Sequence, residues 1–111
     1  MSAPARPRIV PASREHAAAL HILAAPSIRD RADRFVSDRG EIDWLRLELA
    51  AGLWSWGDWL LVRAAHDLCT GHAPAGLKRL CGTLDSGNLR RVLEAVCILR
   101  PDATPARERS Q

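Results

Sequence analysis

The fold is decided by residues 55–71, SWGDWLLVRAAHDLCTG. Ser55 and Asp58 form a capping box of the Ser-x-x-Asp type, so we expect a helix to begin at about Trp56. It ends just before Gly71, because glycine commonly takes the left-handed conformation that closes a helix. The segment between these two signals is the most hydrophobic helix that the sequence predicts. We therefore expect it at the centre of the fold.

Helical spacing of apolar residues continues on both sides of this segment, and no stretch shows the alternation of period two that indicates a strand. Ser13 is the expected cap of the first helix, Ser27 of the second, and Asp85 or Ser86 of the last. The further helices are predicted over 13–25, 28–39, 41–53, 75–84 and 86–100. Short helices without strands predict an all-α fold, either a compact bundle or an orthogonal array of about five to six short helices.

Each predicted helix carries an apolar stripe, and such stripes usually face the core. Outside the central helix they are formed by Ala17, Leu20, Leu23 and Ala24, by Ile28, Ala32, Phe35 and Val36, by Ile42, Leu45, Leu49 and Leu53, by Leu77, Leu80, Cys81 and Leu84, and by Leu89, Val92, Leu93, Val96 and Leu99. We expect these side chains to supply most of the hydrophobic core.

The length of 111 residues suits one domain. Hydrophobic residues make up 47% of the chain and charged residues 26%, which is typical of a globular protein and not of a disordered one. We expect the domain over 13–100, between flexible tails at 1–12 and 101–111. No apolar run is long enough to span a bilayer, so no membrane contact is expected.

The charge of the chain is unevenly distributed around a net value of +3. Residues 41–72 hold five acidic residues against two arginines, whereas residues 1–40 and 73–111 each hold seven basic against four acidic residues. This pattern suits packing of the chain on itself as well as contact with a partner.

Three cysteines are widely and irregularly spaced, which argues against a disulfide scaffold. We therefore interpret Cys69, Cys81 and Cys97 as reduced core thiols of a cytoplasmic protein. An N-terminal export signal is not expected, because Glu15 and His16 interrupt the first apolar segment.

The central helix places Trp56, Trp59, Arg63 and His66 on one stripe when it is plotted at about 100° per residue. Two arrangements remain open. In the first, other helices cover the rings, with the N-terminal helices favoured, and Arg63 stacks nearby. In the second, the stripe is an exposed recognition patch, in which Trp and Arg are favoured anchors. These four residues are the candidate contacts for a protein partner or for a second copy of the chain.

The doublet His66-Asp67 resembles that of HD-type metal-dependent phosphohydrolases, in which histidine and aspartate hold a metal that activates water. That pattern also needs an upstream histidine and a downstream aspartate. Candidates are His16 or His21, and Asp85 or Asp102. A zinc site from His66, Cys69, His72 and Cys81 lacks the usual paired spacing. No catalytic residue, metal or cofactor is assigned from the sequence.

Nucleic acid offers an alternative partner, because Lys78, Arg79, Arg90 and Arg91 could contact phosphates. The last two helices resemble a helix-turn-helix pair in outline only. Aligning Gly87 with the turn glycine of that motif leaves polar residues and glycine at positions that should be apolar, so the motif's register fails.

Part of the chain, from Leu53 to Leu99, resembles a group of small uncharacterised proteins of high-GC actinobacteria. The shared residues are Trp54, Ser55, Gly57, Asp58, Leu60, Leu61, Val62, Ala64 and Leu68, then Leu84, Asp85, Asn88, Val92, Leu93 and Ala95. The resemblance implies a bacterial, intracellular helical protein and carries over no catalytic residues. We thus expect a non-enzymatic, tryptophan-rich helical interaction module, with a small DNA- or RNA-associated regulator and an HD-like phosphohydrolase as alternatives.

Overall fold

The computed structural model describes residues 13–103 and places six α-helices among them. They are α1 (Arg14–Leu23), α2 (Arg29–Ala32), α3 (Trp44–Ala51), α4 (Trp56–Thr70), α5 (Leu77–Thr83) and α6 (Ser86–Leu99), with the 3-10 turns η1 (Asp33–Phe35) and η2 (Pro101–Ala103). Within this range the backbone forms no strand, only an isolated bridge between Val36 and Ile42. The all-α prediction is confirmed.

The predicted tails can be compared with the structure only in part. Residues 1–12 and 104–111 lie outside the described residues. Residues 101–103, which were predicted to belong to the C-terminal tail, instead form the turn η2 directly after α6. Among the described residues, no helix is both long and apolar enough to cross a membrane.

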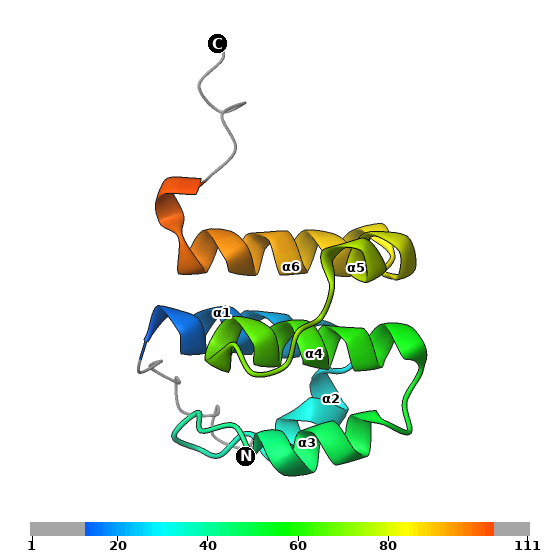
Figure 1. Ribbon diagram of the computed structural model, residues 1–111. Coiled ribbons are helices and arrows are strands. Elements are labelled where there is room, and N and C mark those ends of the chain that lie inside the picture. The colour runs from blue at the N-terminus through cyan, green and yellow to red at the C-terminus, as the bar shows by residue number, and fades with distance from the viewer. Residues whose placement is uncertain (1–12, 104–111) are drawn as a thin grey trace, which may run out of the picture.

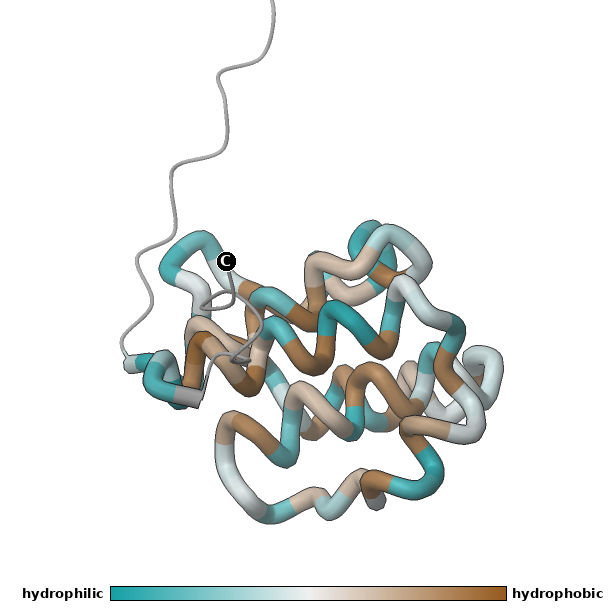
Figure 2. The backbone as a smooth tube through the Cα atoms, turned by 90° about the horizontal axis from the view of Figure 1, so that it is seen from above, coloured by the Kyte–Doolittle hydropathy of each residue, from teal (hydrophilic) through white to brown (hydrophobic). Residues whose placement is uncertain are grey.

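The helices form three layers, with α1 and α4 side by side in the middle (Figure 1). The outer layers are α6 with α5 on one side and α2 with α3 on the other (Figure 1). Leu60, Leu61 and Val62 of α4 are fully buried, and each such side chain contributes about 1.5–3 kcal/mol to folding. Seen from above, the helices alternate hydrophobic and hydrophilic segments along their length (Figure 2). The predicted central position of the 56–70 helix is therefore correct.

The predicted caps of three helices are present. The side chain of Ser13 accepts a hydrogen bond from the backbone N–H of His16, and that of Ser55 accepts one from Asp58. Asp85 caps α6 through a 2.8 Å bond from the backbone N–H of Asn88. Each of these oxygens satisfies a backbone donor that the helix itself leaves unpaired.

The second predicted helix is much shorter than expected. Ser27 does not cap it, and helical structure stops at Phe35, after which Val36 adopts an extended conformation. The cause is a contact between the two sides of the loop that follows: Val36 pairs with Ile42, and the carbonyl of Phe35 accepts a 2.9 Å hydrogen bond from the backbone N–H of Asp43. This local pairing replaces the helical hydrogen bonds, so α3 begins only at Trp44.

Some residues of three predicted core stripes face outward instead. Leu45 and Leu49 on α3 and Leu53 just after it are 73%, 70% and 91% exposed, because α3 packs inward through Leu47 and Ala51. On α6, Leu93 and Val96 are 57% and 37% exposed, and on α5 Leu77 is 81% exposed. On α3 the period of the apolar residues was correct, but the direction in which the stripe faces was not. On α5 and α6 the prediction was correct for Leu80, Leu84 and Val92, which are buried.

The buried side of α1 and the environment of the thiols also differ from the prediction. Ala18, Ala19 and Ile22 are fully buried while Ala24 is exposed, because α1 packs against both α4 and α6. The cysteines are free. Cys69 is half-buried and packs against the core, as predicted in part, whereas Cys97 is half-buried and Cys81 is exposed.

The end of α4 gives a direct test of the fold. Gly71 has a φ of 76° and closes the helix with a hydrogen bond to the carbonyl of Asp67. We expect Gly71→Ala to lower the free energy of unfolding by about 1 kcal/mol, because a Cβ is disfavoured in the left-handed region. Gly57→Ala in the same helix is the control, since Gly57 has ordinary φ and open space around its Cα. It should raise the free energy of unfolding by up to about 1 kcal/mol, as measured by urea denaturation. Equal effects would contradict the assigned C-cap.

Candidate functional site

One carboxylate joins α3 to the polar side of α4. The side-chain oxygen Oε2 of Glu48 lies 2.8 Å from Nδ1 of His66 and 3.6 Å from Nη1 of Arg63. A carboxylate can only accept here, so His66 carries its hydrogen on Nδ1 and donates it. All three side chains are mostly shielded from solvent. The two α4 residues stand about one turn apart, and Glu48 therefore fixes both of them at once.

Aromatic rings extend this cluster along α4. The ring of Trp44 stacks on His66 with centroids 4.4 Å apart and planes 3° apart. At the other end, the guanidinium of Arg63 lies 5.2 Å from the ring of Trp59, which in turn stacks on Trp56 at 5.0 Å. Stacked rings and cation–π contacts are each worth about 0.5–1.5 kcal/mol. We call this set the aromatic–ion array; it consists of Trp44, Glu48, Trp56, Trp59, Arg63 and His66.

The array combines the two arrangements that the sequence left open. Arg63 and His66 are covered, but by α3 and not by the N-terminal helices that the sequence favoured. Trp59 is half-buried, whereas Trp56 is 52% exposed. The stripe predicted on α4 is therefore real, and only its N-terminal end reaches the surface.

A second ion pair holds the segment between α3 and α4. Arg31 donates a 2.7 Å hydrogen bond to the carboxylate of Asp58 and another to the carbonyl of Ser27. Its guanidinium also lies 4.5 Å from the ring of Trp54. Arg31 thus connects α2 to the first turn of α4 and holds Trp54 beside it.

Next to the array lies an exposed apolar surface. Leu45, Leu49 and Gly52 share one side of α3 at spacings of four and three residues. A pocket of about 300 Å³ lies there, lined by Gly52, Trp54, Trp56 and Trp59. We call this surface the α3 face; it consists of Leu45, Leu49, Leu53 and Trp56.

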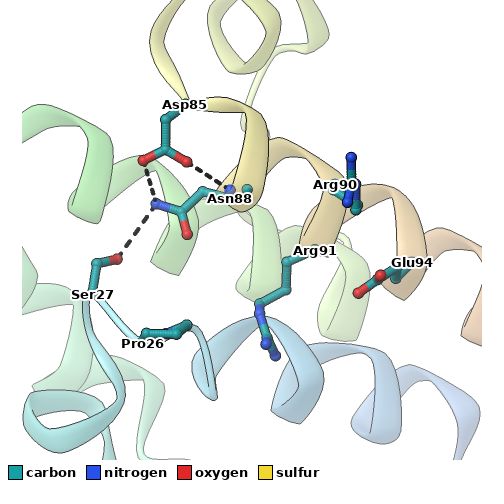
Figure 3. Close-up of a pocket in the computed structure, with 8 residues that line it drawn as sticks. Pro26, Ser27, Asp85, Asn88, Arg90, Arg91 and Glu94 are labelled. Carbon is teal, nitrogen blue, oxygen red and sulfur yellow. Dashed lines mark hydrogen bonds between the residues drawn. The ribbon is translucent and has the colours of Figure 1, made fainter.

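The candidate nucleic-acid contacts lie elsewhere, on α5 and α6. Lys78, Arg79 and Arg90 are exposed, but Arg91 donates a 2.9 Å hydrogen bond to the carbonyl of His21 and so helps to hold α6 on α1. Arg90 and Arg91 line an open pocket of about 460 Å³ (Figure 3). The same pocket is lined by Asp85 and Glu94, so its walls carry equal numbers of both charges.

The polar residues of that pocket are largely engaged with one another. The side-chain amide of Asn88 donates to Ser27 and to Asp85, each at 3.4 Å (Figure 3). Glu94 lies 2.8 Å from Nε2 of His21. These contacts connect the α1–α2 turn to α6 and give the pocket a structural role.

The residues considered for metal binding are dispersed. His16 contacts the carbonyl of Gly40, His21 contacts Glu94, and His66 is held by Glu48. Across residues 13–103, no group of three or more histidine, cysteine, aspartate or glutamate side chains is placed to hold a metal ion. Comparisons with protein-family models, with curated proteins and with solved structures found no match to this chain.

The role of Glu48 can be tested by substitution. We expect Glu48→Ala to lower the free energy of unfolding by about 1–3 kcal/mol, because it leaves His66 shielded and without its acceptor and removes the ion-pair partner of Arg63, which keeps only its hydrogen bond to the carbonyl of Pro74. Glu41→Ala is the matched control, since Glu41 is exposed and its carboxylate bonds to no other described residue. Thermal and urea denaturation followed by circular dichroism measure both. Equal destabilisation by the two variants would contradict the role assigned to Glu48.

The thiols should differ in reactivity. Partial burial raises the pKa of Cys69 above its ordinary value, although a side-chain hydrogen bond with Trp44 opposes this shift. Burial thus favours the neutral thiol, and the stability linked to Cys69 is present at neutral pH and lost as the pH rises through the raised pKa. At about pH 8 we expect iodoacetamide to label exposed Cys81 faster than Cys69, as read by peptide mass spectrometry. In denaturant the two rates should converge; a native Cys69 that reacts as fast as Cys81 would contradict this account.

Proposed function

We propose that this protein is a non-enzymatic helical interaction module that binds another protein, or a second copy of itself, through the α3 face. The observation that supports the proposal most strongly is the exposure of Leu45 and Leu49 on α3, of Leu53 in the short connection after it, and of Trp56 at the start of α4. A contiguous apolar patch on a monomer commonly has a binding role, whereas isolated exposed apolar residues do not require one.

The size of the patch is adequate for association. Full burial of one leucine gains about 1.5–3 kcal/mol, and association costs an estimated 4–15 kcal/mol in lost freedom of motion. Leu45, Leu49, Leu53 and Trp56 together can therefore offset much of that cost. Trp56 beside the pocket at Gly52 has the character of a hot spot, a large ring next to a hollow that a partner side chain can fill.

The aromatic–ion array supports the proposal by making this surface rigid. Trp56 stacks on Trp59, and the ring of Trp59 contacts the guanidinium of Arg63. Arg63 in turn forms an ion pair with Glu48 of α3. A surface whose side chains are already ordered loses little entropy when it binds. In this account Trp56 and Trp59 contact the partner, while Arg63 and His66 position them.

The proposed site of action is the bacterial cytoplasm. All three cysteines are free, and proteins that act in oxidising compartments commonly pair them in disulfides.

A binding experiment with matched leucine variants tests the proposed function. Wild-type, Leu49→Glu and Leu77→Glu proteins are immobilised on separate columns. Each column is exposed to lysate of the source cell supplemented with a labelled second copy that carries the same substitution as the immobilised protein. Because Leu77 is equally exposed but lies on α5, outside the α3 face, Leu77→Glu controls for a charge placed on any exposed leucine.

We expect Leu49→Glu to lose about tenfold or more of the protein that the wild type retains, whether a distinct protein or the labelled copy. Leu77→Glu should retain it fully. If the three columns retain the same proteins, the α3 face is not an interaction surface and the proposed function is wrong.

A further inference from the structure

The opposite side of the molecule carries a second unpartnered apolar stripe. Leu89, Leu93 and Val96 follow one another on α6 at helical spacing, and the last two are exposed. The helix packs on α1 and α4 instead through Val92 and Ala95, which are buried. Leu89 packs against the core, so we call the exposed part of this stripe, Leu93 and Val96, the α6 face.

The α3 and α6 faces point in opposite directions. Figure 1 shows α6 and α3 in the two outer layers, with α1 and α4 between them. Leu49 lies two residues from buried Leu47, and Leu93 lies two residues from buried Ala95. Residues two apart on a helix point to nearly opposite sides, so each stripe faces away from the middle layer. A molecule with two opposed apolar faces can contact two neighbours at once.

The two faces also lie in segments of opposite charge. Residues 37–55, which contain α3, hold four acidic residues against two arginines. Residues 73–103, which contain α5 and α6, hold five basic residues against three acidic ones. Opposite potentials steer two surfaces together and suppress pairing between surfaces of the same sign.

We infer that the partner of the α3 face is the α6 face of a second copy, so that copies of this chain join head-to-tail. This inference rests on the proposed function, because it names the occupant of the α3 face. Each contact would bury Leu45, Leu49 and Leu53 of one copy against Leu93 and Val96 of the next, with an acidic segment against a basic one. Such a heterologous contact leaves one free face at each end and builds either a closed ring or an open chain.

A two-fold dimer is the main alternative, and the charges disfavour it. Pairing α3 with α3 would bring two acidic segments together, and pairing α6 with α6 would bring two basic ones together. Only the contact between α3 and α6 combines apolar burial with opposite charge. It also accounts for both exposed stripes by one contact.

Complementation between two single variants tests the inference. Leu49→Glu blocks the α3 face and Leu93→Glu blocks the α6 face, and both residues are exposed, so both variants should fold. Sedimentation velocity should show oligomers of the wild type that grow with concentration and shrink at high salt. Each variant alone should be a monomer, because every head-to-tail contact needs both faces.

The equal mixture of the two variants is the decisive sample. It should form a dimer, through the intact α6 face of Leu49→Glu and the intact α3 face of Leu93→Glu. Leu77→Glu should assemble as the wild type does. Circular dichroism checks folding, and the milder pair Leu49→Gln and Leu93→Gln replaces any variant that does not fold, with the same expected pattern at weaker amplitude.

The outcomes separate this inference from the proposed function. Any one of three results would overturn the head-to-tail contact: a wild type that is monomeric at every concentration, a variant of the pair that still assembles alone, or an equal mixture that forms no dimer. If the Leu49→Glu column nevertheless loses a distinct protein from the lysate, the interaction surface stands and its partner is not a second copy. If the wild-type, Leu49→Glu and Leu77→Glu columns also retain the same proteins, the proposed function is wrong as well.

Discussion

The rotation of α3 about its own axis depends on the carboxylate of Glu48. The polar side of α4 presents Arg63 and His66. Through Glu48, α3 supplies a hydrogen-bond acceptor for His66 and an ion-pair partner for Arg63. Leaving shielded donors of this kind unpaired costs about 1–3 kcal/mol each, comparable to the gain from burying a leucine. With Glu48 turned inward beside Leu47 and Ala51, the leucines at 45 and 49 must face solvent. A polar contact thus produces the apolar surface on which the functional account rests.

Local signals in the sequence predicted much of this molecule. Ser55 and Gly71 define α4 to the residue, and the shared stripe of Trp56, Trp59, Arg63 and His66 follows from helical periodicity alone. The early end of α2 could not be predicted in this way, since it depends on the bridge between residues 36 and 42. Which side of α3 faces the core could not be predicted either. A periodic pattern shows that a helix has an apolar stripe, but it does not show which element the stripe packs against. Glu48 was missed because its partners lie fifteen or more residues away along the chain.

The proposed surfaces follow from the difference between the middle layer and the two outer layers. The middle layer consists of α1 and α4, whose buried alanines and leucines are covered by an outer layer on each side. The apolar residues of these two helices therefore need no partner outside the molecule. The outer layers each bury one side and leave another apolar stripe in water. A small domain has little apolar surface to spare, so stripes left uncovered on both outer layers are costly unless an assembly covers them. This is the physical reason to assign them one shared role.

The most direct measurement of this account is the solvent exposure of individual leucine methyl groups in solution. A soluble paramagnetic chelate broadens the NMR signals of exposed methyls, and the sample is diluted until the protein is monomeric. The account predicts strong broadening for Leu45, Leu49 and Leu53 and protection for Leu47. Protection of Leu49 together with broadening of Leu47 would mean that α3 is rotated the other way. The α3 face, and every role built on it, would then be contradicted.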